Sequence, residues 1–317
     1  ILPEIKAEDV AVLELSSFQL MTMKKSPDVS VITNITPNHL DVHKDYNEYI
    51  EAKKNILENQ GANGVVVLND KNEITAGIAA ECISKGKRVR MFSAYKSAIS
   101  EFTKGAEGYG FLNEGNLKYV SSLNNIIKYS IARSELKVPG IFNGENLLTA
   151  IAACADTITQ ADVEAVATEF TGVSHRCELV RELDGVKYYN SSIDSSPNRT
   201  IQTLSVFDGN VVMIAGGKDK NIPYDDIGPV ICEKVKTLIL IGPTAEKIEA
   251  AVKACNKFDE KILKILHPNN YKEAVKYACE NAKSGDCVLL SPASTSFDLF
   301  RNFEERGNTF KELALEL

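Results

Sequence analysis

The chain has 317 residues, about twice the ~150 residues typical of one domain, so we expect two domains. Apolar residues make up 44% of the sequence and charged residues 25%, which is ordinary globular usage and excludes a disordered protein. Lys and Arg together number 36 against 43 Asp and Glu, a net charge of −7. The chain therefore lacks the basic excess that nucleic-acid binding requires.

The seven cysteines are far apart, are odd in number and form no C-x-x-C pair, which favours a reducing, cytoplasmic compartment. No apolar run approaches the ~18 residues of a membrane span, and no secretory signal opens the chain. We therefore expect a cytoplasmic protein with no membrane partner. We also expect it to act as a monomer.

Short β-branched runs alternate with helical stretches along the chain. In chain order the runs are 10–15, 29–35, 64–68, 88–92, 186–189, 211–215, 237–241, 262–266 and 287–290. This alternation predicts an α/β fold with mostly parallel sheets and helices on their faces. Between the two groups, 101–119 is rich in Gly, Asn, Lys and Tyr and predicts an irregular or antiparallel insert.

The domain boundary is expected at 171–176, after a predicted helix over 143–157. It divides the chain into a domain over 1–174 and a domain over 175–317. The chain begins at Ile1 rather than Met, and a strand-like run arrives within ten residues. We therefore expect the first domain to be incomplete at its N-terminus.

Three predicted strands of the second half end in unusually polar loops, at 190–196, 216–220 and 291–296. In open α/β sheets, ligands bind beyond the carboxyl ends of the strands. The three loops therefore predict a binding site at one edge of the second sheet.

Lys53 lies in a predicted helix over 45–61, which opens with a capping box between Asp45 and Glu48 and ends at Gly61. The helical spacing places Lys53 on the apolar face of this helix. A desolvated lysine has a lowered pKa, so its neutral amine becomes available for chemistry. In the alternative interpretation, Lys53 extends along the edge of the apolar stripe to water.

His39, Asp41 and His43 lie in "NHLDVH", just after a predicted strand. They are candidate ligands of a divalent metal, or part of a polar strand-to-helix loop. Glu14 follows apolar strand residues, where a carboxylate needs a cation or a paired partner unless it is exposed at an edge.

Asn143 and Asn146 open a predicted helix, where Asn143 could act as the N-cap but Asn146 is not needed for capping. The segment 195–197 reads as an N-cap followed by proline at the first helical position, with free N–H groups suited to a carboxylate or phosphate. The segment 216–220 combines two glycines with two lysines, a pattern also common in surface loops. The phosphate-binding motifs G-x-x-x-x-G-K-[ST] and, after a strand, G-x-G-x-x-G do not occur.

Taken together, these segments closely resemble the Mur ligase family, over essentially all of the chain. The motifs that carry the resemblance occur in the order and spacing of the family: "ELSSFQL" (14–20), "TNITPNHLDVH" (33–43), "EAKKNIL" (51–57), "FNGENLLTAIAA" (142–153), "GVSHRCELV" (172–180), "YYNSSIDSSP" (188–197), "IAGGKDK" (214–220) and "SPASTSFDLFRNFEERGNTF" (291–310). The first and last motifs are highly specific, and resemble the member that adds D-glutamate.

The resemblance implies a central ATP-binding domain followed by a Rossmann-like C-terminal domain that binds D-glutamate. It implies that ATP phosphorylates the carboxylate of UDP-N-acetylmuramoyl-L-alanine and that the amine of D-glutamate then attacks the acyl phosphate. The product is a peptidoglycan precursor, needed for cell shape and division. The family's first domain and its phosphate loop precede "ELSSFQL", so we expect this polypeptide alone to be inactive.

The resemblance also implies roles for individual residues. Glu14 and His39 match magnesium ligands, and Lys53 matches a lysine that CO₂ carbamylates to help hold Mg²⁺. Asn143, Asn146 and Arg176 match nucleotide-binding residues. Ser195, Lys220, Ser296 and Phe303 match the residues that hold the two carboxylates of D-glutamate.

The sequence departs from the family pattern at three positions. Ser191 and Ile193 stand where the family often has Asp and Lys, and Asp194 is a candidate substitute for the lost nucleotide-contacting carboxylate. Phe142 stands where the family usually has His, a change that we cannot interpret.

Two other functions compete with the ligase. One is a metal-dependent hydrolase that uses His39, Asp41, His43 and a carbamylated Lys53. The other is a non-catalytic module that binds glutamate or a nucleotide.

Overall fold

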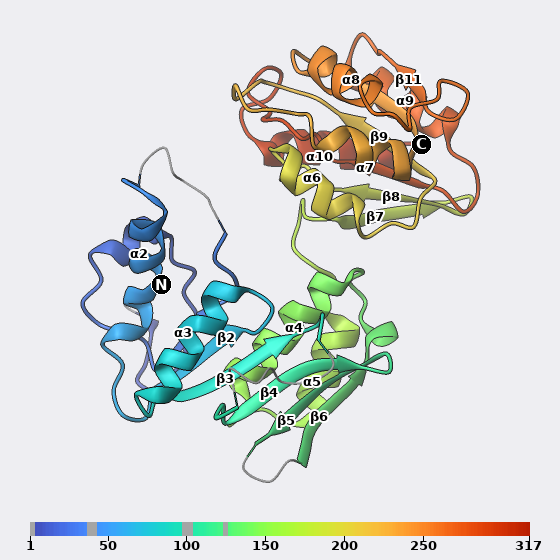
Figure 1. Cartoon of the computed structure of the whole chain (residues 1–317). Helices are drawn as coiled ribbons and strands as arrows, with labels where there is room; N and C mark the ends of the chain where they lie inside the picture. The colour runs from blue at the N-terminus through green and yellow to red at the C-terminus, as the bar shows by residue number, and fades with distance from the viewer. Residues whose placement is uncertain (1–3, 37–42, 97–103, 123–125) are drawn as a thin grey trace. The chain divides into compact units, whose positions relative to one another are not determined.

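A computed structural model describes residues 4–36, 43–96, 104–122 and 126–317. The chain divides into two compact units, Ile1–Phe170 and Thr171–Leu317, each with its own sheet (Figure 1). The predicted α/β class with mostly parallel sheets is confirmed. No helix within the described residues is long and apolar enough to cross a membrane.

The first unit contains a sheet of six described strands in the order β1-β2-β3-β4-β5-β6. The strands are β1 (Val29–Ile32), β2 (Val65–Asn69), β3 (Arg88–Ser93), β4 (Gly108–Asn113), β5 (Asn116–Ser121) and β6 (Ile126–Ala132). The helices are α1 (Ser17–Met21), α2 (Tyr46–Glu58), α3 (Glu73–Ser84), α4 (Ile141–Cys154) and α5 (Gln160–Glu169), with a 3₁₀ turn at Arg133–Glu135. The strands β1 to β4 are parallel, and β5 and β6 continue the sheet antiparallel.

Helices cover both faces of this first sheet, because successive side chains of a strand point to opposite faces. Val65 and Val67 of β2 pack with residues of α4 and α5, whereas Val66 and Leu68 pack with residues of α2 and α3. Buried on both faces, β2 is a continuous apolar run rather than an alternating one.

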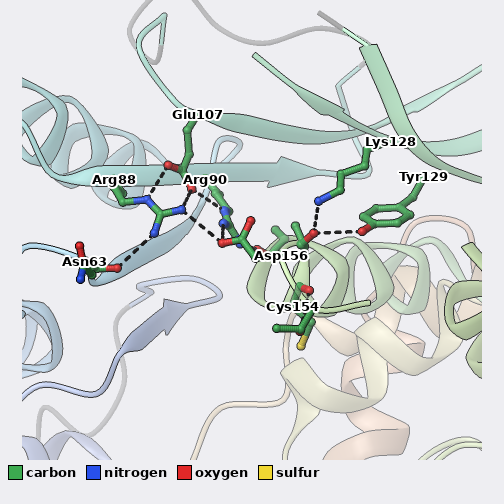
Figure 2. Close-up of polar contacts among 11 residues, drawn as sticks. Asn63, Arg88, Arg90, Glu107, Lys128, Tyr129, Cys154 and Asp156 are labelled. Atoms are coloured by element: carbon green, nitrogen blue, oxygen red, sulfur yellow. Dashed lines mark hydrogen bonds and ion pairs between the residues drawn. The ribbon is translucent and has the colours of Figure 1, made fainter. Parts of the chain in front are cut away.

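A network of ion pairs ties the C-terminal end of α4 to the sheet (Figure 2). Arg90 of β3 is buried; its guanidinium donates to the Ala152 carbonyl at 2.9 Å, to Glu107 at 2.7 Å, and to Asp156. Arg88 donates to the same two carboxylates from a half-exposed position. These cations lie where the last turn of a helix carries partial negative charge.

The second unit contains a sheet of six described strands in the order β11-β10-β9-β12-β8-β7. The strands are β7 (Glu178–Leu183), β8 (Val186–Asn190), β9 (Val211–Ala215), β10 (Val235–Leu240), β11 (Lys264–Leu266) and β12 (Cys287–Leu290). The helices are α6 (Pro197–Leu204), α7 (Ile227–Lys234), α8 (Ala245–Lys253), α9 (Tyr271–Asn281) and α10 (Phe303–Leu315). All strand pairs are parallel except β7 with β8. Helices α6, α7 and α8 contribute to one apolar cluster, and helices α9 and α10 contribute to another.

The described strands differ from the expected ones in three places. The run 10–15 is not a strand, because it pairs with no described neighbour: the side chains of Val10 and Val12 are 88% and 91% exposed. Strand β6 was not predicted, and neither was strand β7. Strand β7 forms a hairpin with β8 through Asp184 and Gly185, both at positive φ, the turn chemistry typical of two-residue hairpins.

Candidate functional site

Three polar loops of the second unit lie at one edge of its sheet, as the sequence predicted. They follow β8, β9 and β12, which are neighbours in the order β9-β12-β8 and are parallel, so their carboxyl ends coincide. The loops at 190–196, 216–220 and 291–296 therefore share one edge. This is the edge at which open α/β sheets bind ligands.

The second and third loops are joined by a short β-bridge. The Lys218 amide donates to the Thr295 carbonyl at 2.9 Å, and the Thr295 amide donates back to Lys218 at 3.3 Å. The glycine before Lys218 is required by space as well as by backbone angle. Gly217 has φ 148, and a Cβ there would lie 2.2 Å from the Thr295 carbonyl oxygen.

The first and second loops meet through a side-chain hydrogen bond. The Lys220 amine lies 3.4 Å from the Ser195 hydroxyl, and the amine is exposed. Ser196 is the N-cap of α6 and Pro197 its first residue, as predicted, and the Ser196 side chain makes no capping hydrogen bond. A cation, a hydroxyl and a helix N-terminus thus lie together, a combination suited to an anionic ligand.

Ser296 and Phe303 lie at the two ends of the segment that connects the third loop to α10. Ser296 is buried, and its carbonyl accepts from the amides of Leu299 and Phe300 at 3.2 and 2.9 Å. Phe303 is the first residue of α10, and its ring lies edge-on to the buried His175 ring, with centroids 5.9 Å apart. The segment between Ser296 and Phe303 is thereby folded back on itself.

Several buried polar groups beneath these loops were not anticipated from the sequence. The Ser294 hydroxyl lies 2.7 Å from that of Thr244 and 2.9 Å from that of Tyr224, while Thr244 also bonds the Gly217 carbonyl at 3.1 Å. Arg306 of α10 is buried beside them. Single hydroxyls far apart in sequence carry no motif, so only the "ERGN" segment around Arg306 offered a signal.

Asp194 and Arg176, the other predicted nucleotide contacts, differ in exposure. Asp194 is buried, and its carboxylate accepts from the Ser291 hydroxyl at 2.7 Å. Burial raises the pKa of Asp194, although hydroxyl donors oppose this effect. Arg176 is exposed. Nucleotide contact by Asp194 stays a prediction, but its carboxylate already has partners inside the unit.

Asn143 and Asn146 lie in the first turns of α4. The N-cap of this helix is Gly140, at φ 96, so the alternative interpretation of Asn143 as the N-cap is wrong. Instead, the Asn143 amide nitrogen donates to the Pro139 carbonyl at 2.6 Å, and its oxygen accepts from Asn146 at 3.3 Å. The two amides are thus held side by side.

A mostly apolar pocket of about 240 Å³ opens beside the two asparagines. Its lining comes from α4, α5 and the segment before α4: Leu136, Val138, Asn143, Asn146, Leu147, Ala150, Val166, Ala167 and Phe170. The volume is below the ~300–1,000 Å³ of sites that enclose whole ligands. An apolar slot with two amides at its rim suits a planar heterocycle with hydrogen-bonding edges.

The predicted magnesium ligands are only partly described. Lys53 is half-buried on α2, its amine 5.2 Å from the centre of the Tyr49 ring, and burial lowers its pKa. Glu14 is exposed. His39 and Asp41 lie outside the described residues. Among the residues that are described, no group of three or more His, Cys, Asp or Glu is placed to hold a metal ion.

His43, a candidate metal ligand in the hydrolase interpretation, is buried, and its side chain packs against residues of α1. Its Nε2 lies 2.9 Å from the Ser17 hydroxyl, and its ring stacks on Phe18 at 5.0 Å between centroids. These contacts hold α1 to the segment before α2.

Two family models match the chain. The Mur ligase middle domain matches residues 3–154, and the Mur ligase glutamate ligase domain matches residues 175–294. Each model matches most of one unit of the structure.

The chain is similar to curated proteins named UDP-N-acetylmuramoylalanine–D-glutamate ligase. It is 49% identical to the one from Ruminiclostridium cellulolyticum, over 99% of this chain and 65% of that protein. It is 50% identical to the one from Acetivibrio thermocellus, over 98% of this chain and 64% of that protein. The chain thus spans somewhat less than two thirds of these relatives.

Solved structures share the fold at low sequence identity. MurC from Thermotoga maritima, a UDP-N-acetylmuramate-alanine ligase, has a TM-score of 0.65 at 15% identity, over 95% of this chain and 62% of its own. MurF ligase from the same organism, in complex with ADP, has a TM-score of 0.59 at 16% identity, over 92% of this chain and 64% of its own.

Proposed function

Because the chain belongs to the Mur ligase family, we propose that it forms the ATP-binding and D-glutamate-binding parts of an amide ligase. The ligase joins D-glutamate to UDP-N-acetylmuramoyl-L-alanine through an acyl phosphate, in peptidoglycan precursor synthesis. Residues 1–174 are the central ATP-binding domain and residues 175–317 the D-glutamate-binding domain. The names of relatives about half identical in sequence support this substrate pair.

The contact between Lys220 and Ser195 carries the proposal. Two residues assigned to D-glutamate come from different loops, and their side chains lie 3.4 Å apart. The exposed amine and the free N-terminus of α6 supply positive charge and N–H donors, which is what a dicarboxylate requires. Ser296 and Phe303 belong to the same loop edge.

The nucleotide half of the proposal rests on the pocket beside α4. An adenine ring fits an apolar slot whose rim carries the amides of Asn143 and Asn146, which offer both donors and acceptors. The complex of Thermotoga maritima MurF with ADP supports a nucleotide in this fold.

Magnesium would be held by Glu14, His39 and a carbamylated Lys53. The environment of Lys53 fits this assignment, because carbamylation needs a neutral amine and burial lowers the pKa of this lysine. When bound, Mg²⁺ neutralises phosphate charge that would otherwise repel the substrate carboxylate. The protein acts in the cytoplasm as a monomer and serves cell shape and division; its described cysteines are free, which fits a reducing compartment.

Titration of the ¹⁵N-labelled chain with D-glutamate and with Mg-ADP tests the proposal. D-glutamate should shift the amide resonances of Ser195, Lys220 and Ser296, and ADP those of α4 around Asn146. L-glutamate is the matched control for the first ligand. Tight, stoichiometric zinc without a response to either ligand would instead indicate the hydrolase, and D-glutamate binding without ADP binding the non-catalytic module.

A further inference from the structure

Arg306 is a buried cation beside the three polar loops, 190–196, 216–220 and 291–296, at the edge of the second sheet. It lies one helical turn after Phe303 on α10 and is only 1% exposed, which makes it one of the largest fully buried side chains of the described chain. Arginine is rarely buried without a paired carboxylate, because removing its charge from water is costly.

The guanidinium binds two of the three loops directly. Its Nε donates to the Ser192 hydroxyl at 3.0 Å and its Nη2 to the Ser192 carbonyl at 2.8 Å. Its Nη1 donates to the Ser294 carbonyl at 3.1 Å. The planar fork of arginine makes these bonds in three directions at once, which a lysine amine does not reproduce.

Arg306 is also close to the start of α10 and to the second loop, although it donates no hydrogen bond to either. The Ser192 hydroxyl donates to the Phe303 carbonyl at 2.8 Å, which links the first loop to the start of α10. The second loop passes so close that a Cβ on Gly217 would lie 3.2 Å from the guanidinium Nη1. Arg306 thus lies against every segment that supplies a residue assigned to D-glutamate.

None of the hydrogen-bond partners of Arg306 carries a negative charge. All three acceptors are neutral, and no described carboxylate lies within ion-pair distance of the guanidinium. Asp194 and Asp298 face it from farther away, and burial lowers the pKa of Arg306. Arginine nevertheless stays protonated in proteins, so the site lies over a fixed positive charge that favours an anionic ligand.

We propose that Arg306 is a positioning residue for the acidic amino acid substrate: it holds the three loops in their binding geometry, and its buried charge favours a dicarboxylate. The inference rests on the proposed function, because it assigns the loops to D-glutamate. It predicts that Arg306 governs D-glutamate affinity without touching the ligand, and that it does not govern nucleotide affinity.

The test compares Arg306→Lys and Arg306→Met with Arg301→Met in the full 317-residue chain. Arg301 is the matched control because its side chain is 89% exposed and pairs only with Glu305, in the first turn of α10. The dissociation constant for D-glutamate should rise at least about tenfold in Arg306→Met, as expected for loss of charged hydrogen bonds. Arg306→Lys should fall between Arg306→Met and the wild type, and Mg-ADP affinity should change in neither.

Ser192→Ala covers the case in which Arg306→Met does not fold. It removes only the hydroxyl between Arg306 and Phe303, so it should weaken D-glutamate binding in the same direction by a smaller factor. Unchanged D-glutamate affinity in both Ser192→Ala and Arg306→Lys would overturn the inference. Equal losses of D-glutamate and ADP affinity would also overturn it, because they indicate a general loss of structure.

Amide hydrogen exchange separates this inference from the proposed function. If the wild type binds no D-glutamate, the proposed function fails. The exchange rates of the Lys218 and Thr295 amides then test whether Arg306 holds the loops. These amides should exchange faster than in the wild type in Arg306→Lys, but not in Arg301→Met. Equal exchange in the two variants would overturn that role.

Discussion

The amine of Lys220 and the hydroxyl of Ser195 lie 3.4 Å apart, although 25 residues separate them in the sequence. Parallel strands explain the contact, because the loops after β8 and β9 leave the sheet at the same edge. A ligand carboxylate that bridges the two groups would gain a charge-assisted hydrogen bond from the amine and a second bond from the hydroxyl.

Lys220→Ala should therefore weaken D-glutamate binding about tenfold or more, since it removes a charged hydrogen bond. Lys218→Ala is the matched control: Lys218 is also exposed, but it joins the loops through its backbone. Calorimetric titration of the two variants checks the prediction. If the two substitutions weaken binding equally, overall charge rather than the Lys220 contact determines affinity.

Asn146→Ala should weaken ADP binding about tenfold, because a ring in the pocket would lose a polar partner at its edge. Asn146 is exposed and bonds only Asn143 through its side chain, so the free energy of unfolding should change little. Fluorescence competition with a labelled nucleotide measures the affinity, and Asn47→Ala, on the exposed surface of α2, is the control. ADP affinity that survives Asn146→Ala would remove the pocket from the nucleotide site.

Lys53 and Lys54 are adjacent but have opposite pKa shifts. Burial lowers the pKa of Lys53. Burial also acts to lower the pKa of Lys54, but the hydrogen bond that Lys54 donates to Glu51 and the charges of Glu51 and Glu81 raise it on balance. At any pH below the ordinary pKa of lysine, a larger fraction of Lys53 than of Lys54 is therefore neutral.

With ¹³C-bicarbonate, the wild type should show a carbamate signal in its ¹³C NMR spectrum. The signal should disappear in Lys53→Arg and persist in Lys54→Arg. It should weaken as the pH falls, because protonation removes the nucleophilic amine. A carbamate signal retained in Lys53→Arg would show that another lysine reacts.

Arg90→Met should destabilise the first unit by about 2–3 kcal/mol, because it breaks a buried ion pair and leaves the Ala152 carbonyl without its donor. The Arg90 side chain is 3% exposed and that of Arg88 is 39% exposed. Arg88→Met, which breaks pairs with the same carboxylates, should therefore cost only about 0.5–1 kcal/mol. Urea unfolding of the two variants measures the difference.

The contribution of this network should also depend on pH. Burial alone would raise the pKa of Asp156, but its hydrogen bonds to Arg90 and Arg88 lower the pKa on balance. An acid with a depressed folded pKa stabilises above its unfolded value of about 3.9 and loses that effect as the pH falls through the folded pKa. The gap between wild type and Arg90→Met should thus narrow below about pH 4. A constant gap between pH 7 and pH 3 would argue against the ion pair as its source.

The sequence by itself determined the α/β class, most strands and the loops of the candidate site. These features are local: β-branched runs such as 211–215 are buried on both faces, and polar loops follow the strands directly. The motifs singled out Lys220, Ser195, Ser296 and Phe303 as candidates, because each lies within a short, characteristic segment.

Only the tertiary structure decided which groups share a site and which polar groups are buried. Residues 10–15 have strand propensity, but propensity without a paired neighbour makes no strand. Asp194 is polar and could have faced a ligand, yet it is buried against Ser291, from another loop. Arg306 lies in the last family motif, but the motif alone does not show that its side chain is buried. Its role depends on bonds to Ser192 and Ser294, which no local pattern encodes because chain folding alone brings them within reach.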